Sequence, residues 1–417
     1  MAKKHNYITG LDIGTTKVCA IIGEYNDVSG ALNIVGLGTS PNYGMKLGAV
    51  IDVGETTQAI HEAITKAEEG LRYRVNEVYV GIAGSHITSQ NLTGNWNVEN
   101  PMRGVTEKDR AEALNRALTN VVTPTNKQLL MKIPQDFILD GNAGVSNPID
   151  MYANTISARV HAVYADRASL GNIKKAIHNV NLTVKEVILE SVASSLALLT
   201  EEQKEAGVAL IDMGGGTSDV AVFTQGQIRY SYEIPFGGDS VTKDLVEVLR
   251  ISYDDAETLK KKHACALSQL VDSSAMVNVT DLVTEERRQV QRYLIAQIVE
   301  SRLEQIFGFA RTKIEEVGVK PVGIVLTGGT SLMPGMRELA SRFFQPDSRA
   351  GEFGVSIGFP TGLTGLAAPV QSPIYSTCVG LVWYGALHPN GIGENAPTGD
   401  SMWGRLSEKI KTIMTQW

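Results

Sequence analysis

Two distant stretches of the chain carry the same pattern of residues. Residues 7–22, YITGLDIGTTKVCAII, place an apolar run before Asp12, a glycine and two threonines after it, and then a second apolar run. Residues 210–223, LIDMGGGTSDVAVF, repeat this order around Asp212, with three glycines in the turn. Apolar runs of this length, bounded by Gly and Thr, are typical of strands joined by a turn. The repeat predicts two similar β-hairpins and therefore an α/β fold with a duplicated core.

Both predicted turns have the residue types that bind phosphate. Glycines let backbone N–H groups approach a phosphate closely, and neighbouring hydroxyls add donors. A carboxylate at the same place would repel a polyphosphate unless a hard cation lay between them, so Asp12 and Asp212 predict Mg²⁺ held through its waters. Either hairpin alone is equally compatible with a plain turn, but two hairpins that face each other would clamp a nucleotide. The candidate phosphate contacts are Gly14, Thr15, Thr16, Lys17, Gly214, Gly215, Gly216 and Thr217.

Two further glycine turns lie at the ends of predicted elements. Residues 323–336, GIVLTGGTSLMPGM, bring an apolar strand into a turn, and residues 235–245, PFGGDSVTKDL, place glycines and an acid before a helical pattern. Four such turns favour one composite nucleotide site. The turns add the candidates Gly237, Gly238, Asp239, Gly328, Gly329, Thr330 and Met333.

Composition limits the remaining classes of function. A chain of 417 residues suits two domains with insertions. Its net charge of -7 argues against a nucleic-acid partner. Cys19, Cys265 and Cys378 are far apart and lack metal-ligand spacing, which favours buried free thiols in a reducing compartment. The histidines lack ligand spacing too, so we expect no metal besides Mg²⁺.

The four turns, in this order, resemble those of the actin, sugar kinase and heat-shock chaperone ATPase superfamily. The resemblance implies an actin-like fold that binds ATP, with residues 12–17 and 212–219 as phosphate loops and residues 326–330 as the adenosine loop. It also implies that Glu257 and Lys260, in the stretch DAETLKKKHACAL, approach the ribose and adenine. Their i and i+3 spacing places both on one helical face, which alone fits a solvated charged surface equally well.

Over residues 10–385 the chain resembles the FtsA family of bacterial cell-division ATPases. Seven stretches carry the resemblance: GLDIGTTKV, GMKLGAVIDV, VYVGIAGSHI, ALIDMGGGTSDVAVF, IPFGGDSVTKDL, GIVLTGGTSLMPGM and YSTCVGLVWYG. The resemblance implies that the protein forms polymers with itself on the cytoplasmic side of the inner membrane. It further implies binding of the FtsZ carboxyl-terminal tail, which would tether FtsZ filaments, and recruitment of later division proteins to the septum.

The pattern along the chain predicts two cores, each with an insertion. We expect the insertion in the first core to consist of short polar strands and a helix near residues 107–118, and the second insertion to be largely helical. In FtsA the first insertion recruits later division proteins. The expected segments are 1–84 (first core), 85–160 (inserted subdomain), 161–206 (first core), 207–236 (second core), 237–304 (inserted helical subdomain), 305–366 (second core), 367–386 (closing segment), 387–402 (linker) and 403–417 (terminal helix).

One long helix is expected from near residue 285 to residue 317. Apolar residues recur at helical spacing through Val290, Leu294 and Ile298, which favours core packing. The resemblance places the FtsZ-tail site beside this stretch, and arginine suits carboxylate recognition. A solvated helix face explains each arginine singly as well. The candidates are Arg287, Arg288, Arg292 and Arg302.

Glu190 is the candidate for catalysis, together with Asp212 at the cation. Glu190 follows the apolar strand of VILESVASS, at a position where members of the superfamily orient the attacking water. It fits a role at the domain hinge equally well. Slow hydrolysis is expected, with ATP acting mainly as a link between the domains.

The end of the sequence predicts a membrane-binding helix. A stretch rich in Gly, Pro, Asn and Asp precedes SMWGRLSEKIKTIMTQW and is expected to be a flexible tether. The final residues then place apolar side chains on one face of a predicted helix. This helix is too short to span a membrane. Docking of this helix on the protein's own core is the alternative. The apolar face consists of Trp403, Leu406, Ile410, Ile413, Met414 and Trp417.

Three other functions share parts of this pattern. A small-molecule kinase would have the phosphate loops, but it would also need a substrate pocket with a catalytic acid. It would have no use for a detached terminal helix. A chaperone needs a peptide-binding domain, for which we expect the 32 residues after Gly385 to be too few. A pilus-assembly actin relative shares the fold and the small insertion, and it is the main alternative.

Overall fold

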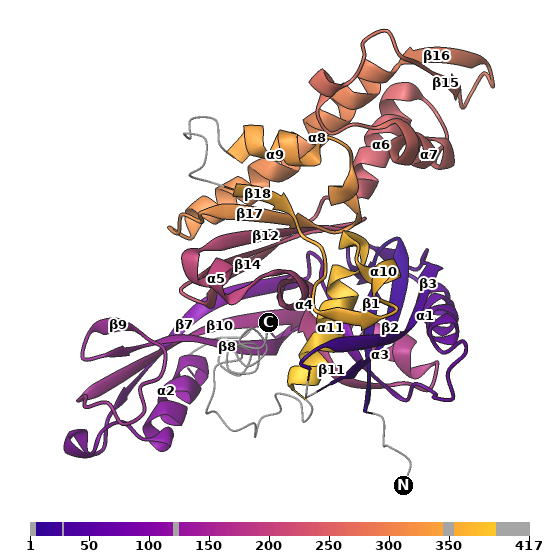
Figure 1. Cartoon of the computed structure of the whole chain (residues 1–417). Coiled ribbons are helices and arrows are strands. Elements are labelled where there is room, and N and C mark those ends of the chain that lie inside the picture. The colour runs from indigo at the N-terminus through magenta and orange to yellow at the C-terminus, as the bar shows by residue number, and fades with distance from the viewer. Residues whose placement is uncertain (1–5, 27–28, 120–124, 345–353, 389–417) are drawn as a thin grey trace.

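The computed structural model describes residues 6–26, 29–119, 125–344 and 354–388 (Figure 1). The predicted terminal helix, residues 403–417, and nearly all of the predicted linker lie outside these ranges. Within them, no helix has the length and apolar character needed to cross a membrane. The three cysteines are buried free thiols, as the sequence predicts.

The first half of the fold is built on a six-stranded sheet. Its elements are β1 (Tyr7–Ile13), β2 (Lys17–Tyr25), β3 (Leu32–Pro41), β4 (Met45–Lys46), β5 (Ala49–Val50), α1 (Val53–Ala67), β6 (Glu77–Ile82), α3 (Arg167–His178), β11 (Thr183–Leu189), α4 (Glu190–Leu198), β19 (Leu363–Gly365), α10 (Ala367–Val370), η4 (Pro373–Tyr375) and α11 (Ser376–Leu387). The strand order is β11-β6-β1-β2-β3-β19. β1 and β2 pair antiparallel with Asp12 opposite Cys19, so the first predicted hairpin is confirmed.

The second half repeats this arrangement. Its elements are α5 (Glu201–Ala206), β12 (Val208–Met213), β13 (Ser218–Thr224), β14 (Gln227–Ile234), α8 (Arg292–Glu316), β17 (Gly323–Thr327), η3 (Gly329–Leu332), α9 (Met336–Phe344) and β18 (Gly354–Ile357). The order β14-β13-β12-β17-β18 matches β3-β2-β1-β6-β11, with an antiparallel meander followed by parallel strands in both sheets. Asp212 lies opposite Asp219 in the second hairpin. The predicted duplication of the α/β core is confirmed.

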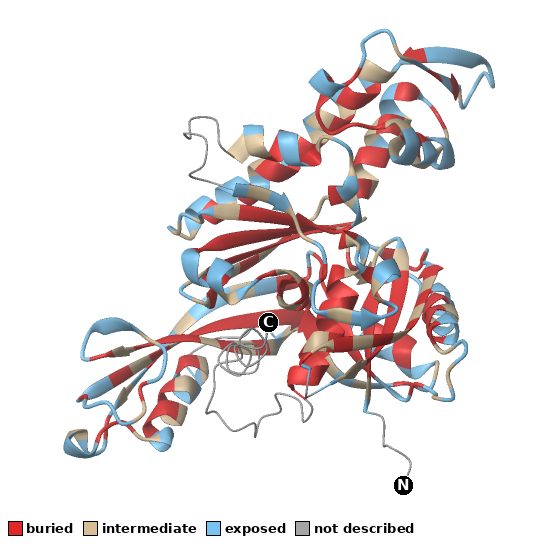
Figure 2. Ribbon diagram, in the orientation of Figure 1, coloured by how far each residue is buried: buried red, intermediate tan, exposed pale blue. Residues whose placement is uncertain are grey.

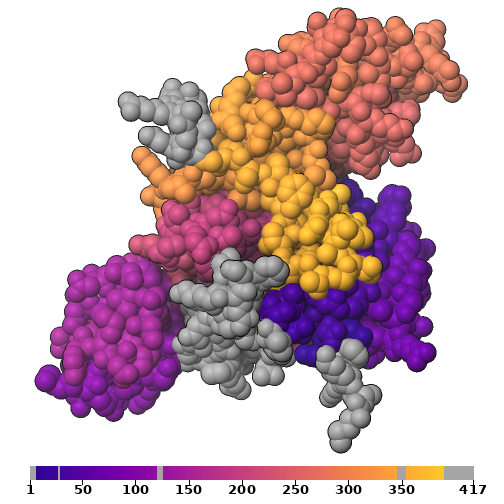
Figure 3. Space-filling model, viewed as in Figure 1, coloured from indigo at the N-terminus to yellow at the C-terminus, as the bar shows by residue number. Residues whose placement is uncertain are grey.

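A separate four-stranded sheet and one helix form the lobe at the lower left of Figures 1 and 3. The elements are β7 (Ile87–Asn97), η1 (Pro101–Arg103), α2 (Glu107–Thr119), β8 (Lys127–Leu139), β9 (Asn142–Val145) and β10 (Thr155–Asp166). The predicted helix is present, but the expectation of short strands is wrong, since β7, β8 and β10 have 11, 13 and 12 residues. Alternate residues such as Phe137, Ile156 and Ala158 are buried, and the polar residues between them obscured the length of the strands.

The opposite lobe combines helices with a hairpin. Its elements are α6 (Gly238–Leu249), α7 (Tyr253–His263), η2 (Ser268–Leu270), β15 (Met276–Thr280) and β16 (Arg287–Gln291). The prediction of a helix from residue 285 is therefore wrong, because 287–291 form a strand and α8 begins at Arg292. Val290 is buried opposite Val277 across the hairpin and not along a helix face. Leu294 is consequently exposed, and the buried stripe of α8 begins at Ile295.

Strand β12 joins the two hydrophobic cores. Successive side chains of a strand point to opposite faces. Val208 and Leu210 therefore pack in the cluster of the first sheet, whereas Ala209 and Ile211 pack in the cluster beneath α6 and α8. Figure 2 shows the buried residues concentrated in the two sheets and the helices between them, with mixed exposure in both lobes. β12, the first strand of the second hairpin, thus contributes side chains to the hydrophobic clusters of both halves.

Polar side chains join the inserted sheet to β14, the edge strand of the second sheet. Asn91 Nδ2 donates to the Arg229 carbonyl at 2.8 Å. His161 is fully buried between Asn91 Oδ1, 2.7 Å from its Nδ1, and Ser231 Oγ, 2.8 Å from its Nε2. Because burial disfavours the imidazolium form, it lowers the pKa of His161 to about 4.

His161 should make stability depend on pH. Its folded pKa of about 4 lies below the value of about 6.5 for an unfolded chain, so its contribution is complete above pH 6.5 and is lost as pH falls toward 4. Between pH 7 and pH 5 the difference in unfolding free energy between the wild type and His161→Gln should shrink by about 2 kcal/mol. Urea denaturation measures this difference, with His178→Gln at an exposed position as the control. A difference independent of pH would contradict the prediction.

Candidate nucleotide-binding site

A pocket of about 570 Å³ lies between the two hairpins. Residues from β1–β2, β12–β13, α6, α7 and the loop after β17 line it. Among the residues predicted to bind the nucleotide, Gly237 is the one that does not line the pocket. It is the N-cap of α6, and an added Cβ would lie 2.7 Å from the Gly214 carbonyl oxygen. The predicted residues that line the pocket are Asp12, Gly14, Thr15, Thr16, Lys17, Glu190, Asp212, Gly214, Gly215, Gly216, Thr217, Gly238, Asp239, Glu257, Lys260, Gly328, Gly329, Thr330 and Met333.

The two hairpin turns have the same local geometry and contact each other. Gly14 N–H donates to the Lys17 carbonyl and Gly214 N–H donates to the Thr217 carbonyl, each at 3.0 Å. A Cβ on Gly216 would lie 2.3 Å from Thr15 Oγ1. Glycine is therefore required at residue 216 so that the two turns can meet.

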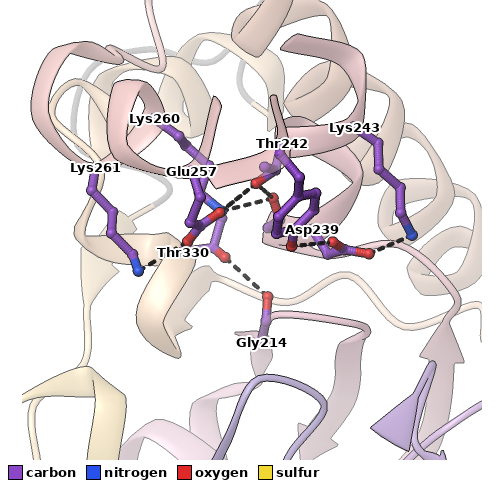
Figure 4. Close-up of polar contacts among 10 residues, drawn as sticks. Gly214, Asp239, Thr242, Lys243, Glu257, Lys260, Lys261 and Thr330 are labelled. Atoms are coloured by element: carbon purple, nitrogen blue, oxygen red, sulfur yellow. Dashed lines mark hydrogen bonds and ion pairs between the residues drawn. The ribbon is translucent and has the colours of Figure 1, made fainter. Parts of the chain in front are cut away.

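The other glycine turns converge on the second hairpin. Gly238 N–H donates to the Gly214 carbonyl at 3.0 Å, and Thr330 Oγ1 donates to the same carbonyl at 2.9 Å (Figure 4). Gly328 has a φ of 81°, which favours glycine, and an added Cβ would lie 2.5 Å from Asp212 Oδ1. Through these contacts, turns that are far apart in the sequence together form one side of the pocket.

Glu257 and Lys260 form an internally bonded pair on α7 (Figure 4). Lys260 Nζ lies 2.7 Å from Glu257 Oε2 and donates to the Gly238 carbonyl at 2.9 Å. The Lys260 side chain is only 13% exposed. It therefore does not lie on a solvated charged surface, which was the alternative that the sequence left open. Thr242 and Lys261 bond to Glu257 as well. The pair therefore presents fixed polar groups to the pocket.

Lys17 lines the pocket but also makes contacts with its own chain. Its Nζ donates to the Ile374 carbonyl at 3.0 Å and lies 4.7 Å from the centroid of the Tyr375 ring. Its charge lowers the pKa of Asp12 and of Asp212 against the larger effect of burial. Lys17 is thus held at the side of the pocket, near both carboxylates.

A cluster of carboxyl groups lies at the pocket, where Asp12, Asp212, Asp219 and Glu190 line it, and includes the buried Glu233 behind it. Burial raises the pKa of Asp12 to about 6 and that of Asp219 to about 7. The pKa values of Glu190 and Glu233 lie well above their ordinary range, first because of burial and then because neighbouring carboxylates repel. Burial also raises the pKa of Asp212. The cluster therefore favours any positive charge that enters the pocket.

The donor set fits a hard divalent cation reached through water. Carboxylate oxygens are the ligands that Mg²⁺ prefers, and Asp219 Oδ1 is buried without a hydrogen-bond partner. In the part of the chain that the structure describes, no three His, Cys, Asp or Glu side chains converge to hold a metal directly. Contact of Asp12 and Asp212 with Mg²⁺ through its waters stays a prediction.

Glu190 occupies the first position of α4 and lines the same pocket. Gly81 leaves space for it, because an added Cβ there would lie 3.0 Å from Glu190 Cγ. The structure thus brings Glu190 to the carboxylate cluster beside Asp12 and Asp212. Its position is compatible both with orienting a water molecule and with a role at the junction of the two halves.

Sequence patterns missed several residues of the pocket. Asp219, Tyr253 and Thr377 line it, and Ser194 contacts Asp212 from behind. Asp219 is the second acid of the hairpin and lies within the predicted phosphate loop of residues 212–219. Thr377 lies in the stretch YSTCVGLVWYG, whereas Tyr253 and Ser194 are common residues on helices.

The four predicted arginines do not share one helix face. Arg287 and Arg288 lie on β16, Arg292 begins α8, and Arg302 lies within α8. Arg302 forms two bonds of 2.6 Å to the Asp244 carboxylate. Arg288 donates to the Leu249 carbonyl and Arg292 to the His263 carbonyl. Three of the four thus have structural contacts, while Arg287 is exposed on the hairpin.

Comparison with known proteins identifies the family. A family model described as "Cell division protein FtsA" matches residues 209–380, and one described as "SHS2 domain inserted in FTSA" matches residues 84–164. The cell division protein FtsA of Pseudomonas aeruginosa is 39% identical over 381 residues, which cover 91% of this chain and 89% of that protein. The chain belongs to the FtsA family. FtsA of Escherichia coli K12 is 34% identical, with 94% of each chain covered.

Solved structures confirm the actin-like fold of this FtsA-family chain. The PilM–PilN type IV pilus biogenesis complex matches with a TM-score of 0.64 at 14% identity, covering 91% of this chain and 98% of that one. MreB5 of Spiroplasma citri bound to ADP matches with a TM-score of 0.54 at 14% identity, covering 93% and 99%. These likenesses concern the fold alone. Sequence identity favours a cell-division protein of the FtsA family over the pilus-assembly alternative.

Proposed function

We propose that this FtsA-family protein binds ATP and Mg²⁺ between its two cores. The observation that carries the proposal is the pair of matching hairpins on opposite sides of one pocket. Backbone N–H groups of residues 15–17 and 215–217 would receive the phosphates, and Glu257 and Lys260 would bind the ribose and adenine. Bound Mg²⁺ would offset the negative charge of the phosphates and carboxylates.

The same proposal assigns a limited catalytic role. Glu190 would orient or deprotonate a water molecule, with Asp212 holding the cation through its waters. Hydrolysis would be slow, and ATP would act mainly as a link that favours one relative arrangement of the cores and thereby controls polymerisation. The shared packing of β12 supports this coupling, because the strand belongs to both hydrophobic clusters.

On the membrane, the protein would polymerise and tether FtsZ filaments at the division septum. The inserted sheet of residues 85–160 would receive later division proteins. The lobe with β15 and β16 would bind the acidic FtsZ tail through the region of residues 287–302. Arg287 is the strongest single candidate, because the other three arginines bond to their own chain. Co-sedimentation with FtsZ, vesicles and ATP tests these roles together.

The cation site predicts a specific loss of affinity. Asp212→Asn keeps the size of the side chain and removes its charge, so it should weaken ATP binding in Mg²⁺ at least tenfold, or about 1.4 kcal/mol. Lys17→Ala should act in the same direction. Calorimetry measures the affinity, and Asp272→Asn at an exposed site provides the control. Unchanged affinity of Asp212→Asn would refute the cation role.

The terminal sequence predicts reversible membrane binding. Three cations, Arg405, Lys409 and Lys411, against Glu408 give the helix a modest attraction of roughly 1 kcal/mol per basic residue near anionic lipid. Polymerisation would add avidity, since linked copies bind together. Removal of residues 403–417, or Trp403→Glu, should abolish pelleting with anionic vesicles while ATP binding survives. Trp403→Phe should still pellet, and full pelleting by the truncated protein at physiological salt would show that the helix serves the core.

A further inference from the structure

Two buried hydroxyl groups hold one oxygen of Asp212. Ser194 Oγ donates to Asp212 Oδ2 at 2.6 Å, and Thr377 Oγ1 donates to the same oxygen at 3.1 Å. The two hydroxyls lie 3.0 Å apart. Asp212 Oδ1, in contrast, faces the loop at Gly328, which lines the pocket. The carboxylate therefore has one oxygen held by two hydroxyls, while the other lies beside the Gly328 turn at the pocket.

The three residues come from segments that are far apart in the chain. Ser194 lies on α4 of the first core, Asp212 is the penultimate residue of β12 in the second core, and Thr377 lies in the first turn of α11. The body of α11 packs on the first core, where Cys378 Sγ donates to the Gly10 carbonyl. The contact is therefore a junction between the two halves.

A close approach of two helices brings the hydroxyls together. An added Cβ on Gly380 of α11 would lie 1.9 Å from the Ala193 carbonyl oxygen of α4, so the helix backbones touch beside Ser194. Ser376, the first residue of α11 and the neighbour of Thr377, forms a hydrogen bond of 2.7 Å between its Oγ and Thr327 Oγ1 of β17. The start of α11 is thus fixed to both cores at once.

Hydrogen bonds of this kind restrict the carboxylate before a ligand arrives. Bonds from hydroxyls to a carboxylate are charge-assisted and directional. Partners of cation-binding groups commonly contribute 10- to 100-fold to metal affinity by orienting them. A carboxylate that acts through the waters of a cation depends on orientation in the same way.

We propose that Ser194 and Thr377 are positioning residues that orient Asp212 toward the divalent cation of the nucleotide site. Because both lie on helices of the first half, whereas Asp212 lies on β12 of the second half, they make this orientation depend on how the cores meet. The inference rests on the proposed binding of ATP with Mg²⁺ and goes beyond it by assigning two residues that act on the cation through Asp212. It predicts that loss of either hydroxyl reduces the contribution of Mg²⁺ to ATP affinity and leaves ATP binding without Mg²⁺ nearly unchanged.

The test compares ATP affinity with Mg²⁺ and with EDTA in the full-length protein. For Ser194→Ala and for Thr377→Val, the ratio of Kd in EDTA to Kd in Mg²⁺ should fall about tenfold, while Kd in EDTA changes less than twofold. Thr377→Ser keeps the hydroxyl and should retain the wild-type ratio. Ser195→Ala is the matched control, because Ser195 is equally buried on α4 but donates only to the Val192 carbonyl.

Other outcomes would overturn the inference. Equal weakening in Mg²⁺ and EDTA would show that the hydroxyls only support packing, and an unchanged ratio would show that Asp212 does not need them. A wild type whose ATP binding ignores Mg²⁺ would refute the proposed cation site itself and the inference with it. If Ser194→Ala fails to fold, the pair Thr377→Val and Thr377→Ser decides the question alone.

Discussion

Burial of carboxyl groups where the two cores meet is the constraint on which the rest of the structure depends. Asp12, Asp212 and Asp219 have raised pKa values because desolvation opposes their charge, and repulsion from neighbouring carboxylates raises the pKa of Asp12 and Asp219 further. Lys17 and the hydroxyls of Ser194 and Thr377 offset only part of this cost at Asp12 and Asp212. A site of this kind is suited to a ligand that brings positive charge, and the glycine turns around it provide backbone donors for the phosphates that would accompany such a cation.

The same junction explains why nucleotide binding and domain arrangement should be coupled. β12 contributes alternate side chains to both hydrophobic clusters, and α11 packs on the first core while its first turn bonds to the second. The two hairpin turns also contact each other at Gly216 and Thr15. A ligand between the hairpins would therefore act on the relative position of the cores.

The sequence predicted the local features of the site well. Hairpins and glycine turns depend on short patterns of apolar, acidic and small residues, so Asp12, Asp212 and the four turns were identified and are found around one pocket. The contact of Ser194 and Thr377 with Asp212 was not predicted, because it depends on the tertiary approach of α4 and α11 and on no motif. The strand β16 was mistaken for helix because Val290 and Leu294 have helical spacing, whereas cross-strand packing against Val277 decides the structure. Long strands in the inserted sheet were underestimated because polar residues such as Ser157, Arg159 and His161 interrupt their apolar residues.

Hydrogen–deuterium exchange on the full-length protein tests the central claim that both hairpins hold one nucleotide. With ATP and Mg²⁺, the backbone amides of residues 15–17 and of residues 215–217 should exchange more slowly than in the free protein. Both segments should reach half of their protection at the same ATP concentration, because a single ligand contacts both. Protection of one hairpin without the other, or protection of the two at different ATP concentrations, would contradict the account.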